Sequence, residues 1–220
     1  ALVKDIGCNI LRCWGGNVYE DDLFYDFCDE KGILVWQDFA MACANYPQDD
    51  DFAAALYREA EWVIREYRNH PSLAIWCGDN EVDMFNFYRK MKPSDNRLTR
   101  EVLPSAIARN DAGRPYLESS PYIEDCMLTE KGKVRSEEHM WGSRDYYKAS
   151  YYKENKSHFA SELGYHGCPA LSSLKKFIRP EQLYPITDES GRVKEDWMVK
   201  ASAMELREGA PYTYRIPLMT

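Results

Sequence analysis

The stretch that decides the fold is SLAIWCGDNE, residues 72–81. It starts as an apolar run of strand length, and at Gly78 it changes into two carboxylic acids and an amide. A buried strand that ends in a polar cavity has this pattern. A single carboxylate at a strand end can equally cap a helix or be solvated, so the ends of the other strands must be compared with this one.

Short strand-like runs alternate with longer helical segments in the first half of the chain. The pattern predicts strands over residues 8–14, 33–39 and 72–77, and helices over residues 20–32 and 51–71. Alternation of this kind indicates parallel strands, because each helical crossover brings the chain back to the same end of the sheet.

The second half of the chain is less regular. We predict two helices and then two strands, over residues 82–91, 95–113, 114–120 and 157–164. Pro104 is expected to bend the second helix. Two charged stretches, residues 129–138 and 187–196, are predicted to be solvated loops. Because the sequence shows no internal repeat and no linker, residues 1–220 are interpreted as one domain.

Polar and aromatic residues follow every predicted strand. In chain order they are Trp14-Gly15-Gly16, Gln37-Asp38, Asp79-Asn80-Glu81, Glu118 and Glu162. In a (β/α)8 TIM barrel, this end of the strands carries the active site. A dinucleotide-binding sheet would instead need a G-x-G-x-x-G turn after its first strand, which the sequence WGGNVYE (14–20) lacks. We therefore predict an α/β fold of the (β/α)8 TIM-barrel type.

The composition indicates a globular protein with a neutral or polar small substrate. The chain is 45% hydrophobic, and its formal net charge is −8. This charge argues against nucleic acid or an anionic membrane as a partner. No run approaches the roughly 20 apolar residues that cross a bilayer. No leader-like segment is expected in ALVKDIG at the start of the sequence, and the compartment is not readable from it.

The seven cysteines and four histidines do not have the spacing of a metal site. The cysteines are odd in number, scattered, and mostly surrounded by apolar residues. We therefore expect buried free thiols, no disulfide framework, no metal and no cofactor.

Two glutamates at strand ends are candidates for the chemistry. Glu81 follows Trp76 closely in the sequence, and an apolar neighbour would keep its carboxyl protonated. Glu162 lies between small residues, with Tyr165 and His166 close enough to hydrogen-bond it, so it is expected to remain ionised. Two carboxyls in different environments are what glycoside hydrolysis requires.

Tryptophans lie near the same strand ends, at positions 14, 36 and 141. Their flat apolar rings suit the faces of a sugar, although a single tryptophan is more often part of the core.

Four long motifs occur in a fixed order along the chain. They are NILRCWGGNVYE (9–20), FYDFCDEKGILVWQDF (24–39), RNHPSLAIWCGDNE (68–81) and SELGYHGCPALSSLKKF (161–177). Together they resemble the barrel domain of glycoside hydrolase family 2, closest to its β-mannosidase and exo-β-glucosaminidase branch. The resemblance covers roughly residues 5–180.

The resemblance implies roles for particular residues. Glu81 would be the general acid/base, Glu162 the nucleophile, and Asn80 a hydrogen-bond partner of the sugar next to the scissile bond. The residues implied to line the subsite for the terminal sugar are Trp14, Asp38 and Trp141. The reaction implied is hydrolysis of a terminal β-linked sugar, a β-mannoside in the favoured case, with retention through a covalent glycosyl-enzyme.

The resemblance starts at the second barrel strand and stops before the eighth. We therefore expect residues 1–220 to be a partial barrel of a larger multidomain glycosidase, without the first and last strands. An open barrel would leave strand edges through which copies of the chain could associate. Two alternatives stay open: an exo-β-glucosaminidase, β-galactosidase or β-glucuronidase on the same fold, or a carbohydrate-binding fragment without catalysis.

Overall fold

The computed structural model describes residues 2–130, 135–141, 150–164 and 169–201. The chain divides into two compact units. The first unit contains Ala1–His139 and Lys156–Ser161, and the second unit contains Met140–Asn155 and Glu162–Thr220.

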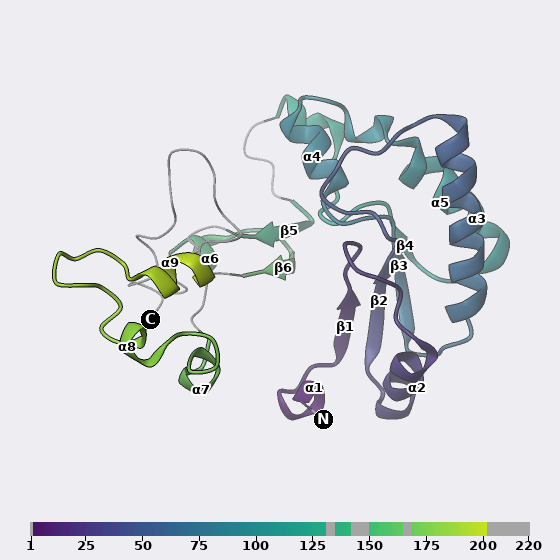
Figure 1. Ribbon diagram of the computed structural model, residues 1–220. Helices are drawn as coiled ribbons and strands as arrows, with labels where there is room; N and C mark the ends of the chain where they lie inside the picture. Colours follow the sequence, from purple (N-terminus) through teal and green to yellow (C-terminus); the bar gives the residue numbers. More distant parts are fainter. Residues whose placement is uncertain (1, 131–134, 142–149, 165–168, 202–220) are drawn as a thin grey trace. The chain divides into compact units, whose positions relative to one another are not determined.

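A four-stranded parallel sheet lies at the centre of the first unit (Figure 1). Its strands follow one another in the order β1 (Ile10–Cys13), β2 (Leu34–Asp38), β3 (Leu73–Cys77) and β4 (Tyr116–Leu117). Because neighbouring strands are parallel, their carboxyl ends meet at one edge of the sheet, as the sequence predicts. The described strands of this unit form an open sheet, and the absence of a first and a last barrel strand stays a prediction.

Helices α2 (Asp22–Lys31) and α3 (Asp50–Tyr67) connect the first three strands, as predicted. Each helix begins at an aspartate cap, Asp21 in α2 and Asp49 in α3, whose side chain accepts a backbone N–H of the first turn. Helix α2 ends at Gly32, whose left-handed backbone (φ 63°) is one that glycine adopts without strain.

The core of the first unit is formed by the sheet with helices α3 and α5 (Leu103–Asn110), which lie side by side (Figure 1). Its buried members include Val35, Phe39, Val63, Ile64, Leu73, Trp76 and Leu103. The Trp76 ring stacks on Phe39 with 5.3 Å between the ring centroids. Its Nε1 donates to Asp111 Oδ2 at 2.9 Å. Trp76 therefore anchors β3 in the core.

The helix predicted over residues 95–113 is divided in two. A π-helical turn covers Leu98–Val102, and α5 follows it directly. The change of helix type lies next to Pro104, which lacks the backbone N–H that an uninterrupted α-helix would use. The irregularity expected at this proline is therefore present as a change of helix type.

The remaining elements are short. They are α1 (Leu2–Asp5), α4 (Val82–Tyr88), 3-10 turns at Pro93–Asp95 and Asp125–Leu128, strands β5 (Glu137–Met140) and β6 (Phe159–Leu163), and helices α6 (Ser150–Glu154), α7 (Leu171–Leu174), α8 (Pro180–Leu183) and α9 (Glu195–Ala201). In the second unit, Leu174, Ile178, Leu183 and Trp197 form a small apolar cluster. Among the helices of the described ranges, none combines the length and the apolar character that a membrane span requires.

The charged stretch 129–138 is not a loop throughout. Its last two residues begin β5, which pairs with β6. Glu137 is buried, and its carboxylate accepts hydrogen bonds from Ser120 Oγ at 3.1 Å and from Tyr122 N at 2.8 Å. The prediction of a solvated loop is wrong here, because these partners are distant in the sequence and local charge does not reveal them. Residues 131–134 of this stretch lie outside the described ranges.

Six of the seven cysteines lie in the described ranges, and each has a free thiol. They are Cys8, Cys13, Cys28, Cys43, Cys77 and Cys126. Cys28 and Cys77 are buried, and the other four are partly exposed. The expectation of free thiols is therefore confirmed for these six, and that of burial for two of them. Cys168 lies outside the described ranges.

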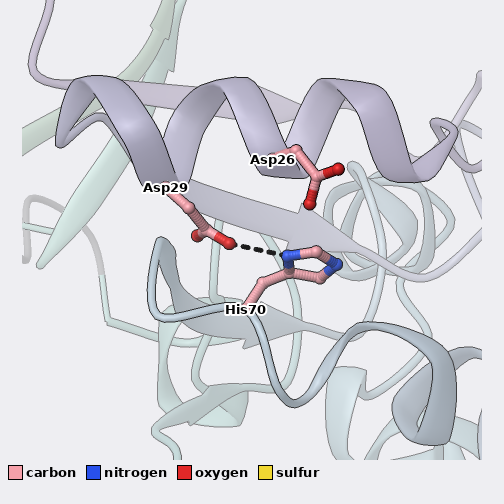
Figure 2. Close-up of side chains that lie close together, drawn as sticks. All are labelled: Asp26, Asp29 and His70. Carbon is pink, nitrogen blue, oxygen red and sulfur yellow. Dashed lines mark hydrogen bonds and ion pairs between the residues drawn. The ribbon is translucent and has the colours of Figure 1, made fainter.

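A carboxylate and histidine cluster joins α2 to the turn before β3. Figure 2 shows Asp26 and Asp29 projecting from α2 toward the His70 ring. His70 Nδ1 lies 2.7 Å from Asp29 Oδ2, and Asp29 Oδ1 accepts a hydrogen bond from Ser72 N at 2.8 Å. The ligand atoms of Asp26, Asp29 and His70 lie within 4.8 Å of one another, so these three could hold a cation. The sequence did not indicate this cluster, because its carboxylates precede His70 by about 40 residues.

We expect Asp29→Asn to lower the free energy of unfolding of the whole protein by about 1 kcal/mol, because it weakens both bonds. Burial raises the pKa of Asp29, but the hydrogen bonds from Ser72 and His70 outweigh it, so the net pKa is lowered. The stabilisation is therefore present above the usual pKa of an aspartate and is lost as the pH falls through the lowered value. Urea unfolding at several pH values measures it. Glu66→Gln, an exposed change in α3 outside this cluster, is the matched control; equal losses in both variants would contradict the role of Asp29.

Candidate active site

Five polar side chains of the first unit gather near the carboxyl ends of its strands. They are Arg12, Asp38, Asn80, Glu81 and His139. The sequence predicts three of them as site residues and misses Arg12 and His139.

Arg12 is at the centre of this group. Its Nη2 donates to Asp38 Oδ2 at 2.8 Å and to Asn80 Oδ1 at 3.0 Å. The buried Asp38 carboxylate also accepts hydrogen bonds from Gly15 N at 3.0 Å and from Trp36 Nε1 at 2.9 Å. Burial raises the pKa of Asp38, while these donors favour its ionised form and oppose the rise. Asp38 is therefore a buried partner of Arg12 that holds the guanidinium in place.

Glu81 lies just beyond β3, where the chain turns into α4. Its backbone is left-handed (φ 66°, ψ 11°), a conformation that is strained for a residue other than glycine. Glu81 N donates to Ser120 O at 2.7 Å, which ties this turn to the segment after β4. Strain of this kind is often found at functional sites, where the surrounding structure fixes the backbone.

Two side chains bind the Glu81 carboxylate. His139 Nδ1 donates to Glu81 Oε1 at 2.8 Å, and Cys43 Sγ donates to Glu81 Oε2 at 3.3 Å. On the other side of the imidazole, His139 Nε2 lies 3.4 Å from Arg12 Nη1. The same Nε2 lies 3.1 Å from Ser120 Oγ, so the imidazole contacts Glu81, Arg12 and Ser120.

The pKa of Glu81 is lowered from that of a free glutamate. Burial raises the pKa of Glu81. The hydrogen bonds from His139 and Cys43 and the charge of Arg12 outweigh this effect, so the net pKa is lowered. The expectation that Trp76 keeps this carboxyl protonated is wrong, because the Trp76 ring is fully buried in the core. Glu81 is therefore ionised in the free protein at neutral pH.

Glu162 lies on β6 and belongs to the second unit. Trp141 Nε1, in the same unit, donates to Glu162 Oε1 at 2.6 Å. The indole covers Gly164, where a Cβ would lie 2.3 Å from a ring atom, so a larger residue there would displace the ring. Tyr165 and His166, the partners expected for Glu162, lie outside the described ranges.

The tryptophans differ in how open their rings are. Trp14 is 46% exposed and Trp141 is 37% exposed, so each has ring surface that a ligand could cover. The Trp36 ring, in contrast, already contacts other side chains. The Arg12 guanidinium lies 5.5 Å from its centroid, and the Phe159 ring stacks on it with 6.3 Å between the centroids. Trp14 and Trp141 are therefore the better candidates for contact with a sugar.

Comparison with known proteins finds several β-mannosidases that resemble the chain, although no family model matches it. The β-mannosidase of Capra hircus is 34% identical over 197 residues, which cover 81% of this chain and 22% of that protein. β-Mannosidase B of Aspergillus niger is 31% identical over 192 residues, covering 79% of this chain and 22% of that protein. The crystal structure of the β-D-mannosidase of Dictyoglomus thermophilum matches with a TM-score of 0.69 and 38% identity over 82% of this chain.

The chain is a β-mannosidase-like domain of glycoside hydrolase family 2. It spans 22% of the length of each of these relatives. The family resemblance given by the four sequence motifs is therefore confirmed.

The sequence missed three residues of the site in this β-mannosidase-like domain. Arg12 carried one signal, a charge inside the otherwise apolar run ILRCW (10–14). His139 lies in a stretch rich in charge, and its partner Arg12 is 127 residues away. Cys43 resembled the other scattered cysteines. A charged residue inside a strand-like apolar run is thus the one signal that could have extended the prediction.

Proposed function

We propose that the whole protein carrying this chain is a retaining exo-β-glycosidase that hydrolyses terminal β-mannosides. The observation that carries the proposal is the Glu81 carboxylate, held at the end of β3 by His139 beside Asn80, in a chain that is 34% identical to a β-mannosidase. The chain would supply part of a (β/α)8 barrel, as one domain of a larger protein.

In the first step, Glu162 attacks the anomeric carbon while the bond from this carbon to the leaving oxygen breaks, and Glu81 gives its proton to that oxygen. In the second step, Glu81 takes a proton from water, the resulting oxygen attacks the anomeric carbon, and the bond to Glu162 breaks. Two inversions give net retention.

Glu81 must gain a proton before the first step, since it is ionised in the free protein. A bound sugar would exclude water from the carboxylate, and desolvation favours the neutral acid. The protonated form can still bind His139, because a neutral carboxyl keeps an oxygen that accepts the hydrogen bond from Nδ1. Substrate binding would therefore supply the change in pKa that the acid role requires.

The other predicted residues have distinct places in this proposal. Asn80 would contact the sugar beside the scissile bond, with its Oδ1 fixed by Arg12. Asp38 would act through Arg12, because its own carboxylate is buried. The rings of Trp14 and Trp141 would line the subsite for the terminal sugar.

The test uses the whole protein and aryl β-glycosides of mannose, glucosamine, galactose and glucuronic acid. We expect the highest kcat/KM on the β-mannoside, and proton NMR should detect β-mannose as the first product. A preference for another sugar would replace the substrate but keep the mechanism, and α-mannose as the first product would overturn retention. Binding of mannose without turnover of any glycoside would favour a carbohydrate-binding protein.

A further inference from the structure

The thiol of Cys43 contacts two of the three polar residues that follow β3, Asn80 and Glu81. Cys43 lies in the segment after β2, and its Sγ donates to Glu81 Oε2 at 3.3 Å. The same sulfur accepts a hydrogen bond from Asn80 Nδ2 at 3.3 Å. One side chain therefore connects the proposed proton donor to the amide beside it.

The backbone reinforces this connection. Cys43 N donates to Asn80 O at 2.8 Å, and Asn80 N donates to Met41 O at 2.9 Å. Cys43 has a left-handed backbone with φ 51°, as Glu81 does with φ 66°. Two strained residues whose side chains are bonded to each other indicate that the local structure holds them in these positions.

Three described groups of the first unit face the Glu81 carboxyl, and they come from different elements. His139 on β5 binds Oε1, Cys43 after β2 binds Oε2, and Arg12 on β1 acts through its charge. Because His139 occupies one oxygen, the thiol determines how the second oxygen is oriented.

We propose that Cys43 is a positioning residue that fixes the Glu81 carboxyl and the Asn80 amide for proton transfer to the leaving group. The inference rests on the proposed function, in which Glu81 is the acid/base. A thiol is a weak donor that stabilises the carboxylate, so its removal should leave Glu81 protonated up to a higher pH.

The experiment measures kcat/KM of the whole protein on 4-nitrophenyl β-mannoside as a function of pH. In Cys43→Ala we expect the descending limb, which reports loss of the Glu81 proton, to move up by roughly 0.5 to 1 pH unit. Cys43→Gly should show the same shift, because glycine suits the positive φ and also lacks the thiol. Cys43→Ser keeps a donor and should restore the wild-type limb.

The matched control is Cys126→Ala. Cys126 also donates to a carboxylate, that of Glu124 at 3.2 Å, but it lies in the 3-10 turn Asp125–Leu128. This variant should leave the pH profile unchanged, so that loss of a thiol bond elsewhere is separated from loss at the site.

The inference is overturned if Cys43→Ala and Cys43→Gly keep the wild-type limb, or if Cys43→Ser shifts as far as they do. Thermal unfolding identifies a variant that does not fold; Cys43→Gly then replaces Cys43→Ala in the comparison. Failure of the proposed function is a separate result, since Glu81→Gln would then leave hydrolysis unchanged in the wild-type background.

Discussion

Glu162→Ala is expected to lower kcat of the whole protein on aryl β-mannosides by about 10⁴-fold or more, whatever the leaving group. The variant removes the carboxylate that would attack the anomeric carbon, so the glycosyl-enzyme cannot form. A better leaving group does not compensate, because alanine has no group that can attack the anomeric carbon. Steady-state rates on 4-nitrophenyl and 2,4-dinitrophenyl β-mannosides measure the effect.

Added azide gives a second test of Glu162 as the nucleophile. With the Glu162 carboxylate removed, azide can attack the anomeric carbon directly, and the single inversion gives an α-mannosyl azide. Glu189→Ala, which removes an exposed glutamate of the same unit, is the matched control and should keep the wild-type rate. Wild-type turnover by Glu162→Ala would exclude this residue as the nucleophile.

Glu81→Gln is expected to slow hydrolysis in proportion to how much the leaving group needs a proton. For substrates with poor leaving groups, such as alkyl β-mannosides, we expect a loss of roughly 10² to 10⁴ in kcat/KM. For 2,4-dinitrophenyl β-mannoside the loss in kcat/KM should be small, because dinitrophenolate departs unprotonated. Glutamine keeps an oxygen that can accept the His139 Nδ1 hydrogen bond, so the variant tests the proton more than the position.

The comparison of leaving groups decides the role of Glu81. A loss of the same size on both classes of substrate would indicate a binding or structural contribution and would remove Glu81 as the acid. Glu66→Gln, an exposed change in α3, should affect neither class.

The parallel sheet could be predicted from the sequence because its signals are local. The apolar runs, the helical spacing between them and the aspartate caps of α2 and α3 each lie within a few residues. The same local reading placed Asp38, Asn80 and Glu81 at one edge, since the carboxyl ends of parallel strands meet there.

The contacts within the site could not be predicted, because they join residues far apart in the chain. Sequence proximity placed Trp76 near Glu81, yet the ring is buried in the core. His139 reaches Glu81 across 58 residues, and no local pattern marks that pairing. The direction of the pKa shift followed from these contacts and was therefore wrong in the sequence-based prediction.

The left-handed backbone of Glu81 means that the residue with the least backbone strain at position 81 is not the residue that the reaction requires. Glycine at position 81 would relieve the strain, which for left-handed residues is worth about 1 to 2 kcal/mol. It would also remove the proton donor. Selection by melting temperature alone does not register the loss of the proton donor, so engineers of a heat-resistant form should hold residue 81 fixed during selection.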